Sequence, residues 1–187
     1  MTLEAILEGV PLAGGLPAQE VEISGICYDT RTLTPGCLFV ALPGYKTDGH
    51  GYIQEALELG AAAVLLIAAL LDGDTLRDYI GVAHSLGLSA LVEAHTAEET
   101  EVAVKAGARI IGVNNRDLRT FQVDTGNCLR LRPLVPRSVL FVAESGVRTA
   151  ADIDRLRAGG VDAVLVGETL MRAPDRKAAL AALRGTP

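Results

Sequence analysis

The sequence predicts an α/β fold in which about seven mostly parallel strands, covered by helices, form part of a (βα) barrel. Apolar residues make up 49% of the 187 residues, with no tryptophan and few aromatics, so the core is built from Val, Leu, Ile and Ala. A short apolar phrase led by glycine recurs after amphipathic stretches, as GAAAVLL at 60, GLSALVE at 87, GARIIGV at 107 and GVDAVLV at 160. Glycine ends a helix in the left-handed conformation, and the short apolar run is typical of a strand buried on both faces.

The N-terminal 60 residues follow a different rhythm. VEISGICYDTR (21–31) alternates in part, LTPG (33–36) supplies a turn, and CLFVAL (37–42) is a second short strand before the helix YIQEALEL (52–59). A crossover helix needs about a dozen residues, so the short connection predicts that these two strands are antiparallel.

The most apolar stretch, GAAAVLLIAALL at 60–71, is closed by Asp72 and is too short for a spanning helix, which needs about 20 residues. We interpret residues 62–67 as a buried strand. Further strands are predicted at 89–93, 109–113, 139–144 and 162–166, with helices at 74–86, 97–106, 126–133, 149–158 and 175–184. Thr96 and Thr149 are suitable N-caps, each followed by acidic residues. Parallel strands joined by helices cross over right-handed, so this part should curl towards a barrel; an open three-layer sheet is the alternative.

Composition and charge exclude several classes of function. The net charge is -6 and the arginines are scattered, so no basic stripe offers itself to nucleic acid. The three cysteines have no CxxC spacing, which indicates reduced thiols in a cytoplasmic protein. The N-terminus carries Glu4 and Glu8 where a signal peptide would be positive. The histidines lack metal-ligand spacing, so we expect no metal. We also expect no cofactor. Because the most apolar stretch is too short to span a bilayer, we expect no membrane partner.

One stretch, YDTRTLTPGCLFVALPG followed by DGHGYIQEALELGAAAVL, resembles the UDP-binding N-terminal domain of the Mur ligases, in particular UDP-N-acetylmuramoyl-tripeptide synthetase. The resemblance covers about residues 20–65. It implies uridine contacts from Thr30, Arg31, Tyr45 and Lys46. Those ligases also use ATP, but the sequence has no glycine-rich phosphate loop ending in GKT or GKS, so ligase activity is excluded.

The remaining sequence is similar to the C-terminal part of indole-3-glycerol phosphate synthase, a (βα)8 barrel of tryptophan synthesis. ALVEAHT, RIIGVNNRDLRTFQVD, VAESGVRT and DAVLVGETLMRA carry the resemblance, which covers about residues 55–185 and strands four to eight of the barrel. It implies catalytic positions at Glu93, Asn114 and Glu144, and a phosphate site at Ser145, Gly146, Gly167 and Glu168. The implied reaction closes a ring with loss of carbon dioxide and water, and needs a lysine acid and a carboxylate base.

From these two resemblances we predict a single chimeric domain over residues 1–187, Mur-ligase-like over about 1–60 and synthase-like over about 61–187, natural or engineered. None of the lysines, Lys46, Lys105 and Lys177, ends a predicted barrel strand, so we expect no native catalytic activity, with a phosphate-binding site retained. The alternatives are a synthase-like lyase and a uridine-nucleotide binding module. We expect the sheet to close in a barrel-like manner and the protein to form a homodimer.

Overall fold

The computed structural model describes residues 23–42, 48–117 and 120–185. Its strands form one sheet in which every neighbouring pair is parallel and the spatial order follows the chain order. The strands are β1 (Ile26–Cys27), β2 (Leu38–Val40), β3 (Ala63–Ile67), β4 (Ser89–Ala94), β5 (Ile110–Asn114), β6 (Leu140–Glu144) and β7 (Ala163–Leu165). The predicted partial barrel of seven parallel strands is confirmed.

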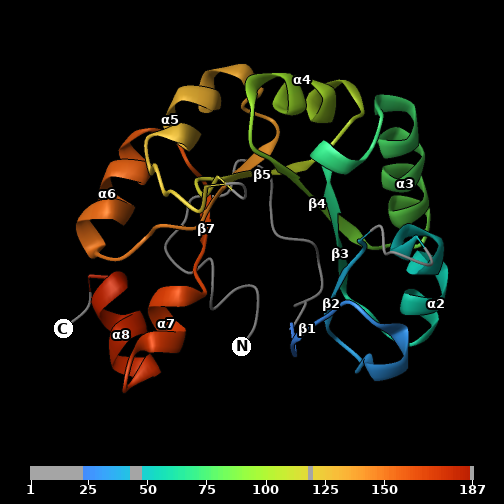
Figure 1. The fold of residues 1–187 in the computed structure, drawn as a ribbon, viewed down its shortest axis with the longest axis horizontal. Coiled ribbons are helices and arrows are strands. Elements are labelled where there is room, and N and C mark those ends of the chain that lie inside the picture. Colours follow the sequence, from blue (N-terminus) through green and yellow to red (C-terminus); the bar gives the residue numbers. More distant parts are fainter. Residues whose placement is uncertain (1–22, 43–47, 118–119, 186–187) are drawn as a thin grey trace.

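The helices lie outside the curved sheet, which forms an arch in Figure 1. They are α2 (Ile53–Glu58), α3 (Gly73–Ser85), α4 (Ala97–Lys105), α5 (Asn127–Leu131), α6 (Ala150–Ala158), α7 (Glu168–Arg172) and α8 (Arg176–Leu183). Because the helices cover only the convex face, the arrangement is a curled half barrel and not the alternative three-layer sheet. Within the described residues β1 and β7 are the two edge strands and do not pair with each other, so the sheet does not close there into the expected barrel.

The prediction that the first two strands are antiparallel is wrong. Ile26 pairs with Leu38 and Cys27 with Phe39 in parallel register. The connection contains only a 3-10 turn, Thr30–Thr32, capped by Asp29. A short connection suffices because the strands are two and three residues long, so the chain returns over a small distance.

The strands and helices predicted from residue 60 onward are found within two residues of their expected bounds, and α7 was not predicted. Thr96 caps α4, and Thr149 forms a capping box with Asp152 at the start of α6. No helix among the described residues is both long and apolar enough to cross a membrane.

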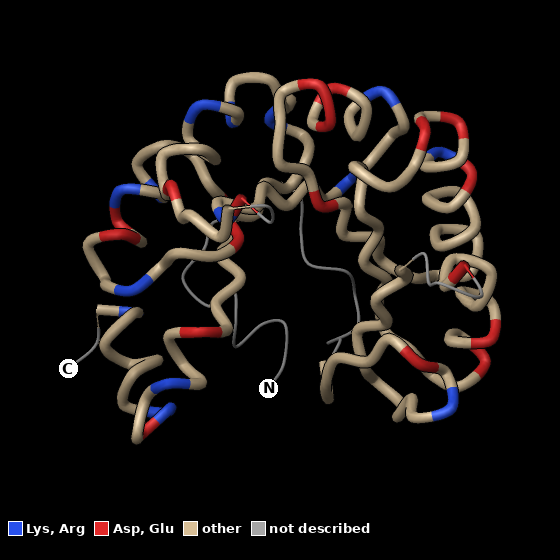
Figure 2. Tube along the Cα trace, in the orientation of Figure 1, with Lys and Arg blue, Asp and Glu red and all other residues tan. Residues whose placement is uncertain are grey.

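The core lies between the strands and their outer helices. Along the strands every second side chain is buried there, and the register aligns Val92 with Ile111 and Ile111 with Phe141. Neighbours in a parallel register point to the same face, and successive residues alternate between faces. Residues between these core positions therefore face the concave side. Figure 2 shows the charged residues gathered mainly on the outer helices.

Candidate active site

Three polar side chains meet at the carboxyl ends of neighbouring strands. Glu93 is the penultimate residue of β4, and Asn114 and Glu144 are the last residues of β5 and β6. Glu93 is paired with Gly112 and Asn114 with Glu144, so all these positions alternate with the core residues and share the concave face. The Asn114 amide donates to Glu93 Oε1 at 3.3 Å. The structure thus brings together the three residues that the sequence suggested as catalytic.

The two carboxyl groups form a buried pair. Glu93 and Glu144 are only 7% and 4% exposed, too little for water to stabilise two adjacent negative charges. Burial, followed by the charge of Glu93 and a hydrogen bond to it, raises the pKa of Glu144 to about 9. Glu144 therefore holds a proton at neutral pH, and the pair offers one acid and one carboxylate side by side.

Gly112 makes room for this pair, a role that the sequence analysis missed. A Cβ at Gly112 would overlap Glu144 Oε1 and would lie 3.2 Å from Leu91 Cδ1. Only glycine leaves the Glu144 carboxyl space on the concave face of β5. The available signal was a glycine inside an apolar strand, which often marks a close approach of other atoms.

Asn115, the second residue of the NN pair, holds the loops around the site and was also missed. It is 3% exposed; its amide donates to Ser145 O at 3.2 Å and its Oδ1 accepts from the Cys128 backbone N at 3.1 Å. Ser145 has a φ of 65°, a left-handed conformation that non-glycine residues rarely adopt. Asn115 thus stabilises the turn that directs the chain away from Glu144. Adjacent asparagines at a strand end point to opposite faces, which was the signal for two separate roles.

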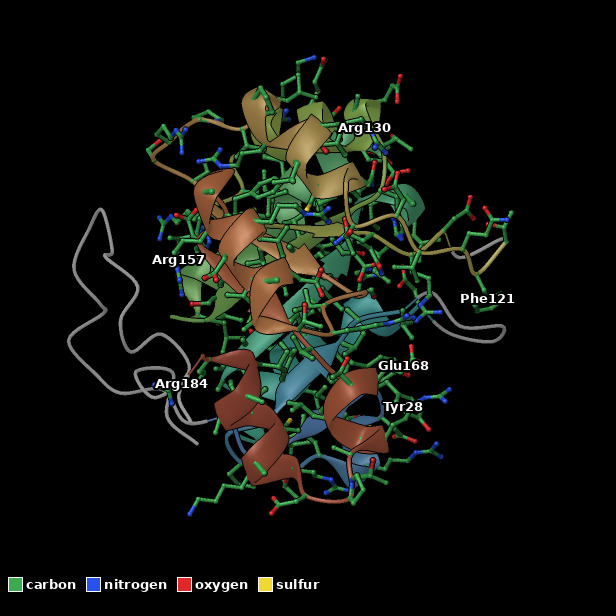
Figure 3. The ribbon with its side chains drawn as sticks, turned by 90° about the vertical axis from the view of Figure 1, so that its left-hand side faces the viewer. Tyr28, Phe121, Arg130, Arg157, Glu168 and Arg184 are labelled. Carbon is green, nitrogen blue, oxygen red and sulfur yellow. The ribbon has the colours of Figure 1, made fainter. Side chains whose placement is uncertain are left out.

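A cavity of about 700 Å³ opens beyond the ends of β6 and β7. The predicted phosphate-site residues Ser145, Gly146, Gly167 and Glu168 all line it, together with Arg116, Arg148 and Arg172. Glu168 does not stand free in this cavity, because Arg116 donates to its Oε2 at 2.5 Å and Arg172 Nε lies 3.1 Å from its Oε1. Three arginines against one carboxylate leave the lining positive, as an anion site requires. In Figure 3 Glu168 and Phe121 lie towards the right of the view, and Arg157 and Arg184 lie towards the left.

Of the residues suggested for uridine binding, Thr30 and Arg31 lie among the described residues. The guanidinium of Arg31 is engaged by Asp29, with Nε–Oδ1 and Nη2–Oδ2 distances of 2.9 and 2.6 Å. This hydrogen-bonded pair lowers the pKa of Asp29 to about 2. Thr30 is buried beside it, and Tyr45 and Lys46 lie outside the described residues. Among the described residues no group of three or more His, Cys, Asp or Glu is placed to hold a metal ion.

Comparison with known proteins matches the sequence model of the indole-3-glycerol phosphate synthase family to residues 50–183. The indole-3-glycerol phosphate synthase of Ruminiclostridium cellulolyticum is 60% identical over 134 residues, which cover 72% of this chain and 52% of the relative. That of Lactiplantibacillus plantarum is 53% identical over 148 residues, or 78% of this chain and 57% of the relative. The chain spans about half the length of the curated relatives it matches.

Solved structures share the fold at low sequence identity. Thiamine phosphate pyrophosphorylase from Pyrococcus furiosus has a TM-score of 0.59 and 19% identity, covering 80% of this chain and 65% of that one. 3-Hexulose-6-phosphate synthase has a TM-score of 0.58 and 18% identity, covering 80% and 73%. At these identities the likeness supports the fold alone.

These matches overturn the prediction of a chimera and, with it, the leading prediction of a protein without catalytic function. The uridine contacts stay a prediction. The matched region begins at residue 50, before the predicted boundary between the two parts at about residue 60, so that boundary lies inside one family. None of the matches described here is to a Mur ligase, and the relatives carry the name of an enzyme. Short strand and turn phrases such as DTR and LFVALPG were too brief to identify a family. The chain belongs to the indole-3-glycerol phosphate synthase family.

Proposed function

We propose that this chain acts as a lyase that forms indole-3-glycerol phosphate, with Glu93 and Glu144 transferring protons and the arginine-lined cavity holding the substrate phosphate. The observation that carries the proposal is the buried carboxyl pair, in which burial and the charge of Glu93 raise the pKa of Glu144 to about 9. Ring closure with loss of carbon dioxide and water needs a proton donor for the leaving hydroxyl and an acceptor for a substrate proton.

Glu144 takes the role of acid in this proposal. A lysine was the expected acid, but Lys105 is exposed on α4 and paired with Glu101, and Lys177 belongs to α8. Neither ends a described strand, whereas the Glu144 carboxyl lies at the end of β6 with its proton retained. Donation of that proton to the hydroxyl would release water and leave a carboxylate, and Glu93 would accept a proton from the substrate. Asn114 holds Glu93 Oε1 in place for this step.

The phosphate end of the substrate is assigned to the cavity beyond β6 and β7. Ser145 and Gly146 directly follow Glu144, so the anion site and the acid are adjacent in the chain. Arg116 follows Asn114 by two residues and reaches Glu168 across the cavity. A bound phosphate would compete with Glu168 for Arg116 and Arg172, and these arginines can give it charge-assisted hydrogen bonds. Phosphate sites at the same face of (βα) barrels use the loops after the last two strands.

The experiment is an assay of indole-3-glycerol phosphate formation from carboxyphenylamino-deoxyribulose phosphate. We expect turnover by the unaltered chain, and a loss of about 100-fold or more for Glu93→Gln and for Glu144→Gln. Glu55→Gln, at an exposed position of α2, is the matched control and should leave turnover unchanged. No product at high protein concentration, or equal rates for all three variants, would reject the assignment. The cytoplasmic location remains a prediction from the sequence.

A further inference from the structure

His95 lies between the buried carboxyl pair and the surface. It directly follows β4, and its Nε2 is 3.4 Å from Glu93 Oε1 while its Nδ1 is 3.5 Å from Glu99 Oε2 on α4. The side chain of His95 is 17% exposed, that of Glu93 10% and that of Glu99 22%. The imidazole therefore bridges an inner carboxylate and an outer one.

The position of the imidazole is held by three elements. The His95 backbone N donates to Glu99 Oε2 at 2.6 Å, and the Asn127 amide at the start of α5 donates to His95 O at 3.0 Å. The Nε2 atom is buried and has no hydrogen-bond partner among the described residues, although it faces Glu93. A buried polar atom without a hydrogen-bond partner destabilises the folded protein, and a catalytic role is one explanation for keeping such an atom.

The groups that face His95 decide what it can transfer. They are Glu93 from β4 and Glu99 from α4. The neutral amide of Asn127 from α5 binds the His95 backbone oxygen, and that of Asn114 from β5 binds Glu93. Glu144 from β6 lies one step further, next to Glu93. An imidazole has two ring nitrogens that exchange donor and acceptor roles, so it can take a proton on one side and release one on the other.

We propose that His95 is a positioning residue that orients Glu93 and relays protons between the Glu93–Glu144 pair and solvent through Glu99. Glu99, which takes a proton from solvent, passes one to Nδ1 and Nε2 passes one to Glu93. This leaves the ring proton on Nδ1 in place of Nε2, and tautomer exchange through solvent restores the starting form. Its part in turnover rests on the proposed lyase function, but the relay itself is a property of the resting protein. Loss of carbon dioxide from a substrate carboxylate takes up one proton in each reaction cycle, and a route from solvent would deliver that proton to the buried pair.

The test uses His95→Gln, which keeps size and hydrogen bonding but cannot transfer protons, in the full chain. Its control is His84→Gln, near the carboxyl end of α3 at the opposite end of the sheet. The first measurement is hydrogen–deuterium exchange of the protonated Glu144 carboxyl, followed by infrared spectroscopy without substrate. We expect exchange to slow about tenfold or more in His95→Gln, to slow also in Glu99→Gln, and to be unchanged in His84→Gln.

The second measurement is the steady-state turnover of the variants, with kcat and KM determined separately. His95→Gln should lower kcat about 10- to 100-fold with KM unchanged, and added imidazole should restore part of the rate in His95→Gly. Unchanged carboxyl exchange in both His95→Gln and Glu99→Gln would reject the relay. Slowed exchange in a chain that forms no product would instead reject the lyase proposal and leave the relay standing. If His95→Gln does not fold, Glu99→Gln decides, because Thr96 still caps α4.

Discussion

Replacing Glu144 by glutamine should stabilise the protein, and the gain should grow as the pH rises. Burial and the neighbouring Glu93 raise the pKa of Glu144 from an ordinary 4.5 to about 9. Between these values the folded chain binds a proton that the unfolded chain does not, so the free energy of unfolding falls with increasing pH. The stabilising contribution is complete below the unfolded pKa and is lost as the pH passes through the folded one. Glutamine resembles the protonated acid and does not titrate.

The magnitude follows from the shift. One pKa unit corresponds to about 1.4 kcal/mol, so three pH units between about pH 5 and pH 8 amount to at most about 4 kcal/mol. Taking this as the upper value, we expect a difference of about 2 to 4 kcal/mol between the two chains at pH 8 and a small one at pH 5.

The assay is urea unfolding followed by circular dichroism at several pH values, with the midpoint and slope fitted separately. Glu55→Gln, an exposed substitution of the same chemistry, should run parallel to the unaltered chain at every pH. If the Glu144→Gln curve is also parallel to the unaltered chain, Glu144 is already ionised at neutral pH. That result would refute the protonated pair and, with it, the assignment of the acid.

Four further predictions follow from the same contacts. Gly112→Ala should destabilise the protein by about 1–3 kcal/mol in urea unfolding and lower turnover, whereas Gly81→Ala, with open space around it, should be neutral or slightly stabilising. Asn115→Ala should cost about 2–3 kcal/mol, because two buried backbone groups lose their partner; a change under 0.5 kcal/mol would contradict this. Arg116→Gln should weaken binding of inorganic phosphate about tenfold by calorimetry, with Arg130→Gln on α5 as the control that keeps it. Light scattering should give twice the chain mass of 19.6 kDa if the expected homodimer forms, and a monomer mass would exclude it.

Much of the architecture could be predicted because its signals are local. Each helix–glycine–strand phrase contains its own start, stop and periodicity, so residues 89–93 and 97–106 were assigned without knowledge of their neighbours. The first two strands failed for the opposite reason. Their direction depends on where β3 lies, since β2 pairs with both β1 and β3, and the length of a connection does not contain that information.

The candidate site also has one part that could be predicted from the sequence and one part that could not. The types of residue at the strand ends, Glu93, Asn114 and Glu144, could be recognised in the sequence. Their chemistry could not, because the pKa of Glu144 depends on burial and on a carboxylate 51 positions earlier in the chain. The same holds for Glu168, because only the structure shows Arg116 and Arg172 against its carboxylate.

The sequence by itself determined the parallel α/β class, most element positions and the resemblance of residues 55–185 to the synthase family, since periodicity, glycine placement and long ordered motifs are properties of the chain. Only the tertiary structure decided the parallel direction of β1 and β2, the open arch of the described residues, the need for glycine at 112 and the place of His95 between two carboxylates. These depend on register across strands, and register places side by side residues that the sequence separates by tens of positions.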